Sequence, residues 1–261
     1  MPTFESGGVT LAYDDIVPQG HQGTILLLHG FASNRNEGWR RTGWYGAFER
    51  RRIRCIGLDQ RCHGESAKLY DPQACTRDRL AADALALLDH LDVKFAHVFG
   101  YSMGTGTAMQ LALDAPDRVD KLILGGIGER LFEPRRAQPE ERGMSLSEAM
   151  LAEDPASIEG DFARSFRHFA DEQGEDRQAL AAFLQAPNGP LDRDGLGKLP
   201  MEVLVVAGDA DKGAGDPAGL ARHFPYGKSR TIPGCDHFSA IPHALTKAAV
   251  FDFLDGMLDE P

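Results

Sequence analysis

Short apolar runs recur along the chain, bounded by Gly, Asp or His, and they predict strands. The runs occupy residues 24–28, 53–58, 96–99, 122–124 and 203–207. Unbroken apolar runs of this length are typical of strands buried on both faces, as in parallel sheets covered by helices. Residues 9–17 predict a further, antiparallel strand at the edge of the sheet.

Patterns with helical spacing lie between these runs. After Thr76, a candidate N-cap, apolar side chains recur three and four residues apart, which predicts an amphipathic helix. The stripe consists of Leu80, Ala84, Leu87, Leu88 and Leu91. Residues 242–258 predict a closing helix. The alternation of strands and helices predicts an α/β fold with a doubly wound, mostly parallel sheet.

The strand pattern stops between residues 128 and 198, where charged, Ala-rich helical patterns replace it. This break predicts a small helical cap, residues 128–198, inserted into a core domain made of residues 1–127 and 199–261. Phe162, Phe166 and Phe169 share one helix face of the insertion. Their rings either pack between cap and core or line a substrate pocket, and different rings can serve each role.

Length, charge and cysteine spacing narrow the class of protein. The 261 residues suffice for one compact domain with an insertion, and the net charge of −11 argues against nucleic-acid or anionic-membrane partners. The start lacks a leader pattern and no apolar run approaches the roughly 18 residues of a membrane helix, so we expect a cytoplasmic protein. The four scattered cysteines predict free thiols, and no spacing predicts a metal or cofactor. The oligomeric state stays open.

The strongest chemical signal is the run Gly-Tyr-Ser-Met-Gly from Gly100 to Gly104. It follows a predicted strand and precedes a helical pattern, as in the G-x-S-x-G nucleophile elbow, where a strained turn exposes the serine. Glycine at both flanks removes side chains that would clash in such a turn. The helix N-terminus adds positive potential for a developing oxyanion. Ser102 is therefore the candidate nucleophile.

A serine hydroxyl needs a base, and the base needs an orienting acid. In this motif's fold both follow the nucleophile along the chain. His237 lies in a loop after a short strand pattern at residues 228–232, and Asp209 and Asp211 directly follow the run at 203–207. The order serine, aspartate, histidine is the expected one.

Upstream, the run at 24–28 ends at His29, Gly30 and Phe31. This is the place where such a fold supplies one oxyanion-hole amide, so the expected donors are the backbone N–H groups of Phe31 and Met103. Because backbone amides do this work, we assign His29 a structural role in shaping the loop.

Together these motifs resemble those of the α/β-hydrolase superfamily over nearly the whole chain. Residues 59–66 are similar to its Asp-x-Arg-Gly-His-Gly-x-Ser turn beside the active site, with Cys62 in place of the first glycine. The resemblance implies the α/β-hydrolase fold, Ser102 as nucleophile, His237 as base and Asp211 rather than Asp209 as acid. Serine at position 102 excludes the alkyl-enzyme chemistry of relatives that carry a carboxylate there.

The function expected from the resemblance is hydrolysis of small carboxylic esters through an acyl-enzyme on Ser102. Carbon–carbon bond hydrolysis and cofactor-free perhydrolysis use the same triad and stay open, as does a non-catalytic, receptor-like member of the fold. A pocket for short acyl groups is expected from four aromatic side chains, Tyr101, Phe162, Phe166 and Phe238.

Overall fold

The computed structural model describes residues 2–132 and 144–258, and over these residues eight strands form one sheet. The spatial order is β1-β2-β4-β3-β5-β6-β7-β8, and the pairs β1·β2 and β2·β4 are antiparallel whereas all the others are parallel. The strands are β1 Thr3–Ser6, β2 Val9–Ile16, β3 Gly23–Leu28, β4 Ile53–Leu58, β5 Ala96–Tyr101, β6 Val119–Gly125, β7 Glu202–Gly208 and β8 Gly227–Ile232. The mostly parallel α/β fold predicted from the sequence is confirmed.

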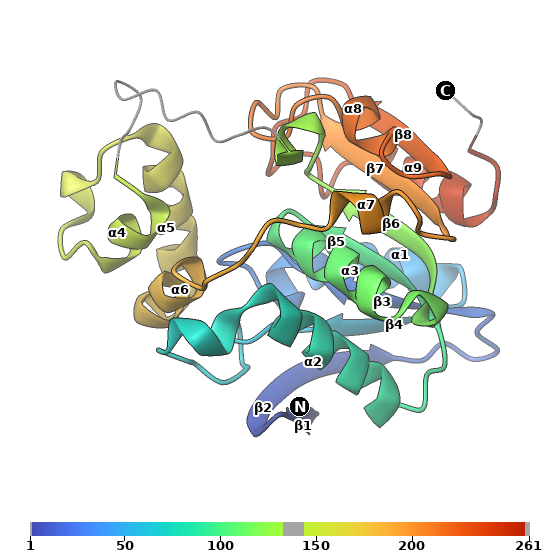
Figure 1. Cartoon of the computed structure of the whole chain (residues 1–261), viewed down its shortest axis with the longest axis horizontal. Coiled ribbons are helices and arrows are strands. Elements are labelled where there is room, and N and C mark those ends of the chain that lie inside the picture. The colour runs from blue at the N-terminus through green and yellow to red at the C-terminus, as the bar shows by residue number, and fades with distance from the viewer. Residues whose placement is uncertain (1, 133–143, 259–261) are drawn as a thin grey trace.

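Helices connect the strands and cover both faces of the sheet (Figure 1). The α-helices are α1 Trp44–Arg50, α2 Arg77–His90, α3 Met103–Asp114, α4 Leu146–Leu151, α5 Asp161–Gln173, α6 Arg177–Leu184, α7 Arg193–Leu196, α8 Pro217–Ala221 and α9 Ala244–Leu254. Shorter helical turns are η1 Asn36–Arg40, η2 Pro72–Cys75, η3 Pro116–Arg118, η4 Glu129–Phe132 and η5 Pro155–Ser157.

Side chains of the central strands point alternately to the two faces of the sheet, and each face is covered by its own layer of helices. Ile25 and Leu27 of β3 join the core around α1 and α9, while Leu26 and Leu28 join the core around α2 and α3. Successive side chains of a strand point to opposite faces, so a strand covered on both sides is apolar throughout. All four side chains are fully buried.

At one side of the sheet the prediction from sequence was wrong in a detail. The segment predicted as the edge strand forms β2, which lies between β1 and β4, and the short β1 is the edge. Phe4 of β1 packs into the core, and the Ser6 hydroxyl donates to Asp83 Oδ1 at 2.6 Å. A four-residue strand with one buried aromatic ring is too short to show a period in the sequence.

Residues 144–192 carry α4, α5 and α6, which form a separate group at one end of the sheet (Figure 1). Of the predicted insertion, residues 133–143 lie outside the described part. Its two ends, η4 and α7, contact α8 and α3 of the main body. The cap boundaries therefore stay a prediction.

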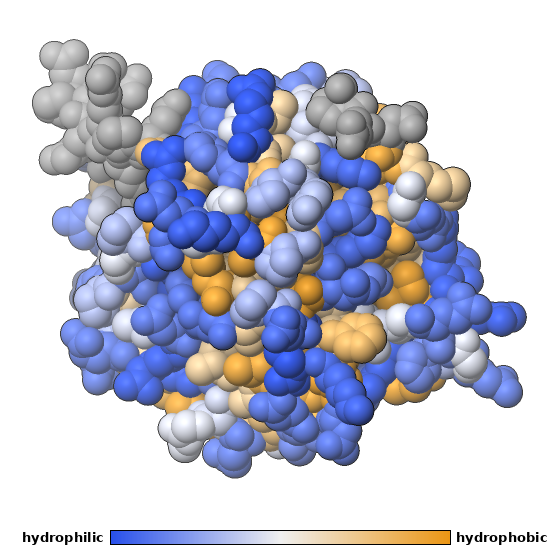
Figure 2. Space-filling model, turned by 45° about the vertical axis from the view of Figure 1, so that its right-hand side comes forward, coloured by the Kyte–Doolittle hydropathy of each residue, from blue (hydrophilic) through white to orange (hydrophobic). Residues whose placement is uncertain are grey.

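One face of the molecule is largely hydrophilic. Figure 2 shows hydrophilic side chains dominating the face it draws, with apolar side chains visible only in small patches between them. In residues 2–132 and 144–258, none of the helices combines the length and the apolar character needed to cross a bilayer.

Candidate active site

The turn between β5 and α3 holds Ser102 in a strained conformation. Its φ and ψ are 52° and −115°, a region that side chains with a Cβ rarely adopt. A Cβ on Gly100 would lie 2.3 Å from Gly104 O, and a Cβ on Gly104 would lie 2.1 Å from Leu28 O. Both glycines are thus required by close backbone approach, and the turn places the serine at the carboxyl end of the sheet.

The three residues predicted as a triad lie in hydrogen-bonding sequence. Ser102 Oγ lies 2.9 Å from His237 Nε2, and His237 Nδ1 lies 2.7 Å from Asp211 Oδ2. With Nδ1–H donating to the carboxylate, Nε2 is free to accept the serine proton. Asp211 is buried, whereas His237 is partly exposed toward the cavities.

Backbone amides fix the acid of this arrangement. Asp211 Oδ1 accepts from the N–H groups of Gly213 and Ala214, each at 3.1 Å, which leaves Oδ2 for His237. The neighbouring Asp209 is exposed, and its carboxylate accepts from Gly234 N at 2.7 Å instead. Asp209 therefore braces the loop that carries the histidine and does not touch the imidazole.

Tyr101, predicted to line a pocket, also anchors the histidine loop. Its hydroxyl donates to the backbone oxygen of His237 at 2.7 Å. Burial raises the pKa of Tyr101, so the phenol stays protonated as a donor. Its ring lies at 5.7 Å from the imidazole, centroid to centroid.

The two predicted oxyanion donors come from different loops. Phe31 follows β3, and Met103 is the first residue of α3, where backbone N–H groups have no partner within the helix. Within the described residues, neither amide donates to another protein group. Both are thus available to a bound oxygen atom.

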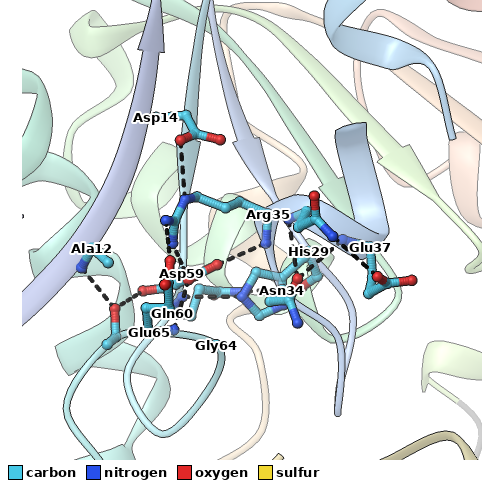
Figure 3. Close-up of polar contacts among 12 residues, drawn as sticks. Ala12, Asp14, His29, Asn34, Arg35, Glu37, Asp59, Gln60, Gly64 and Glu65 are labelled. Carbon is cyan, nitrogen blue, oxygen red and sulfur yellow. Dashed lines mark hydrogen bonds and ion pairs between the residues drawn. The ribbon is translucent and has the colours of Figure 1, made fainter. Parts of the chain in front are cut away.

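A buried glutamine contacts His29 in the loop after β3 (Figure 3) and also contacts helix α3. Gln60 N donates to His29 Nε2 at 3.0 Å, and Gln60 Nε2 donates to His29 O at 2.9 Å. On its other side, Gln60 Oε1 accepts from Thr107 Oγ1 in α3 at 2.6 Å. Burial lowers the pKa of His29, so the imidazole is neutral and accepts through Nε2. The structural role expected for His29 is consistent with these contacts, whereas sequence reasoning missed Gln60 and Thr107.

Ion pairs of Arg35 stabilise the segment that follows Phe31. Arg35 pairs with Asp59 and Glu65, and with Asp14 at 3.2 Å, while Arg35 N donates to Asp59 Oδ1 at 2.7 Å (Figure 3). The guanidinium is buried, so the pairing offsets the cost of removing it from water. Asp59 opens the turn that resembles the superfamily motif, so this network joins that turn to the loop of Phe31.

Two cavities meet at Ser102 and His237. The smaller, of about 180 Å³, is mainly apolar and is bordered by Phe31, Tyr101 and Phe169. The larger, of about 1200 Å³, has Arg130, Lys212, Asp161 and Asp236 among its lining residues. Of the other predicted pocket residues, Phe166 and Phe238 border both cavities, and Phe162 borders only the larger one, with 64% of its surface exposed.

A buried carboxylate ties the segment of α5 and α6 to the turn at residues 59–66. Glu175, between these helices, accepts from Gly64 N at 2.9 Å and from Asn34 Nδ2 at 3.0 Å, and it pairs with Lys68 at 3.5 Å. Its side chain is only 2% exposed. Burial raises the pKa of Glu175 despite these partners. No pattern in the sequence predicts this contact, because Asn34 and Glu175 lie 141 residues apart.

In the part of the chain that the structure describes, no three His, Cys, Asp or Glu side chains are grouped so as to hold a metal ion.

Comparison with known proteins agrees with this fold. A sequence model of the alpha/beta hydrolase fold matches residues 23–146. The chain is 33% identical over 245 residues to the dihydrolipoyllysine-residue acetyltransferase component of an acetoin cleaving system from Pseudomonas putida, covering 89% of this chain and 63% of that protein. The chain thus spans less than two thirds of this relative's length.

Another relative is a 2-hydroxymuconate semialdehyde hydrolase from Pseudomonas putida, 27% identical over 87% of this chain and 84% of its own length. Among solved structures, a hydrolase from Pseudomonas aeruginosa PA01 superposes with a TM-score of 0.75 at 24% identity, over 97% of each chain. Fold, motifs and family match define one class. The chain has the α/β-hydrolase fold, and its motifs resemble those of the α/β-hydrolase superfamily.

Proposed function

We propose that this protein is a serine hydrolase that cleaves small carboxylic esters through an acyl-enzyme on Ser102. The observation that carries the proposal is the continuous hydrogen-bonded path from Ser102 Oγ through His237 to Asp211. His237 Nε2 takes the serine proton as Oγ attacks the ester carbonyl, and the imidazolium then gives it to the leaving alcohol. A water molecule repeats the sequence to release the acid.

In this proposal the developing oxyanion is bound by the amides of Phe31 and Met103. Donors that are already oriented stabilise negative charge without reorganisation, and the N-terminus of α3 adds positive potential. The small, mainly apolar cavity borders Phe31 and takes the acyl chain, and the larger cavity takes the leaving group. The helices over the site act as a cap.

A second candidate is carbon–carbon bond hydrolysis. It is favoured by the likeness to the semialdehyde hydrolase of Pseudomonas putida and needs the same triad. A panel containing p-nitrophenyl esters and vinylogous 1,5-diketones separates the two. Turnover of the diketones above that of every ester would replace the first candidate with the second.

The test of the nucleophile is Ser102→Ala with a fluorophosphonate probe. The native protein should gain one covalent adduct and the variant none, while both keep the same circular dichroism spectrum. Ser165→Ala is the matched control, because Ser165 borders the larger cavity but its hydroxyl donates to Asp161 O at 2.8 Å. Labelling that persists in Ser102→Ala, or is lost in Ser165→Ala, would overturn the assignment.

A further inference from the structure

Two of the cysteines lie in contact although the sequence separates them by 13 residues. Cys62 Sγ and Cys75 Sγ are 2.9 Å apart, and both side chains are fully buried. Two carbon atoms in optimal contact lie about 3.5–4.0 Å apart, and sulfur is the larger atom. The pair is therefore unusually close for two free thiols.

The pair occupies a junction between the core and the cap helices. Cys62 belongs to the turn at residues 59–66, where it replaces the glycine of the superfamily motif and adopts a left-handed φ of 73°. Cys75 ends η2. Both thiols pack with Ala179 of α6, and Phe183 of the same helix borders the cluster.

We propose that Cys62 and Cys75 are a modification site, at which a hydroperoxide converts the two thiols into a reversible disulfide. A disulfide needs a sulfur separation of about 2.05 Å, so the atoms must approach by less than 1 Å. The remaining cysteines, Cys55 and Cys235, have no such partner among the described residues.

The two sulfurs have different roles in the reaction. The hydrogen bond from Cys75 lowers the pKa of Cys62, and the charges of Arg61 and Lys68 act in the same direction. The hydrogen bond with Cys62 raises the pKa of Cys75. Cys62 is therefore the thiolate that attacks the peroxide, and Cys75 is the resolving thiol.

The steps balance for a hydroperoxide ROOH. The Cys62 thiolate attacks the terminal oxygen, the O–O bond breaks, and the released alkoxide takes up the thiol proton to give ROH and a sulfenic acid. Cys75 then loses its proton, its sulfur attacks Cys62 Sγ, and the S–O bond breaks to release water. The two thiols lose two electrons, and the peroxide is reduced by two.

The bond would close a short loop and fasten the turn at residues 59–66 to η2. A cross-link of this kind stabilises the fold by restricting the unfolded chain, so the oxidised protein should melt several degrees higher. Ser102 lies outside the linked loop, so probe labelling of Ser102 should persist. Because α6 covers both sulfurs, oxidation should proceed slowly.

The experiment treats the native protein with hydrogen peroxide, removes the oxidant, and alkylates all remaining thiols in denaturant. We expect two fewer alkylated thiols by intact mass, a peptide joining Cys62 to Cys75, and a raised Tm, all reversed by dithiothreitol. None of these measurements depends on hydrolase activity. The experiment can therefore contradict the disulfide site without contradicting the proposed hydrolase function, and the hydrolase function can be contradicted without contradicting the disulfide site.

Three variants complete the test. Cys62→Gly should fold, because glycine suits the left-handed backbone at this position. Both Cys62→Gly and Cys75→Ser should lose the cross-link and the rise in Tm. Cys235→Ser, which removes another buried thiol, should retain both. Four alkylated thiols after treatment, a sulfinic acid at Cys62, or a cross-link that survives Cys62→Gly would each overturn the proposal.

Discussion

Asp209 and Asp211 follow the same strand, but only Asp211 reaches His237. The Asp211 carboxylate lies 2.7 Å from Nδ1, while that of Asp209 accepts from Gly234 N. Asp211→Asn should keep the fold and lower kcat by about ten-thousand-fold, because the amide favours the wrong imidazole tautomer, as in another serine enzyme. Steady-state kinetics on p-nitrophenyl acetate measure this loss.

Asp209→Asn is the matched variant, since its amide oxygen can still accept from Gly234 N. It should lose less than about tenfold in kcat, because the imidazole keeps its partner. If Asp209→Asn loses most of its kcat while Asp211→Asn keeps a nearly normal kcat, the assignment of the acid is reversed.

Gln60 contacts His29, two residues before the candidate donor Phe31, and Thr107 in α3, whose first residue is Met103. Gln60→Leu removes its contacts with His29 O and Thr107 Oγ1. We expect kcat to fall by about tenfold with KM nearly unchanged, because misplaced donors weaken the transition state more than the bound ester. Steady-state kinetics separate kcat from KM.

Thr107 provides the test of this link. Thr107→Val should resemble Gln60→Leu, the double variant should be little worse than either, and Thr107→Ser should restore kcat because it keeps the hydroxyl. If all of these variants have lower thermal stability but unchanged kcat, the role of Gln60 is purely structural.

At the scale of elements, Glu175 joins α5 and α6 to the turn at residues 59–66, and burial raises its pKa. The folded state then holds the proton more tightly than the unfolded chain does, so this group's contribution to stability falls as pH rises through its folded pKa. Glu175→Gln keeps an acceptor for Gly64 N but does not titrate. The variant should therefore gain stability relative to the native protein as pH rises above the ordinary glutamate pKa of about 4.3.

Urea unfolding at a series of pH values gives the difference in unfolding free energy between the two proteins. Subtracting one curve from the other removes the titration of all other groups. A difference that stays flat, or that moves in favour of the native protein as pH rises, would contradict a raised pKa at Glu175.

The elements also show what a sequence can and cannot predict. The sequence predicts that Ser102, His237 and an aspartate after residues 203–207 lie together, because each follows a recognisable strand pattern and parallel strands bring their carboxyl ends to one edge. The family resemblance, and not the strand pattern, favours Asp211 over Asp209 as the acid. Gln60 with Thr107, and Asn34 with Glu175, join segments whose approach depends on how helices pack on the sheet. No local period encodes such contacts. The edge strand β1 was missed for a different reason, its length of four residues.

At the scale of the whole molecule, the two cavities determine which esters fit. If the acyl chain occupies the cavity of about 180 Å³, each methylene should help by roughly 0.8 kcal/mol only while it is buried there. The larger cavity, of about 1200 Å³, imposes no such limit on the leaving group. The same enzyme should therefore be selective for the acid and tolerant of the alcohol.

The difference in volume between the two cavities predicts a preference for short acyl chains. In a series of p-nitrophenyl esters, kcat/KM for acetyl to hexanoyl chains should exceed that for dodecanoyl and longer chains. Phe169 borders only the small cavity and Phe162 only the large one. Phe169→Ala should move the optimum toward longer acyl chains because it enlarges the acyl cavity, whereas Phe162→Ala should leave the optimum in place. Activity that keeps rising beyond the decanoyl ester in the native protein, or an optimum that moves with Phe162→Ala instead, would show that the acyl chain lies in the larger cavity.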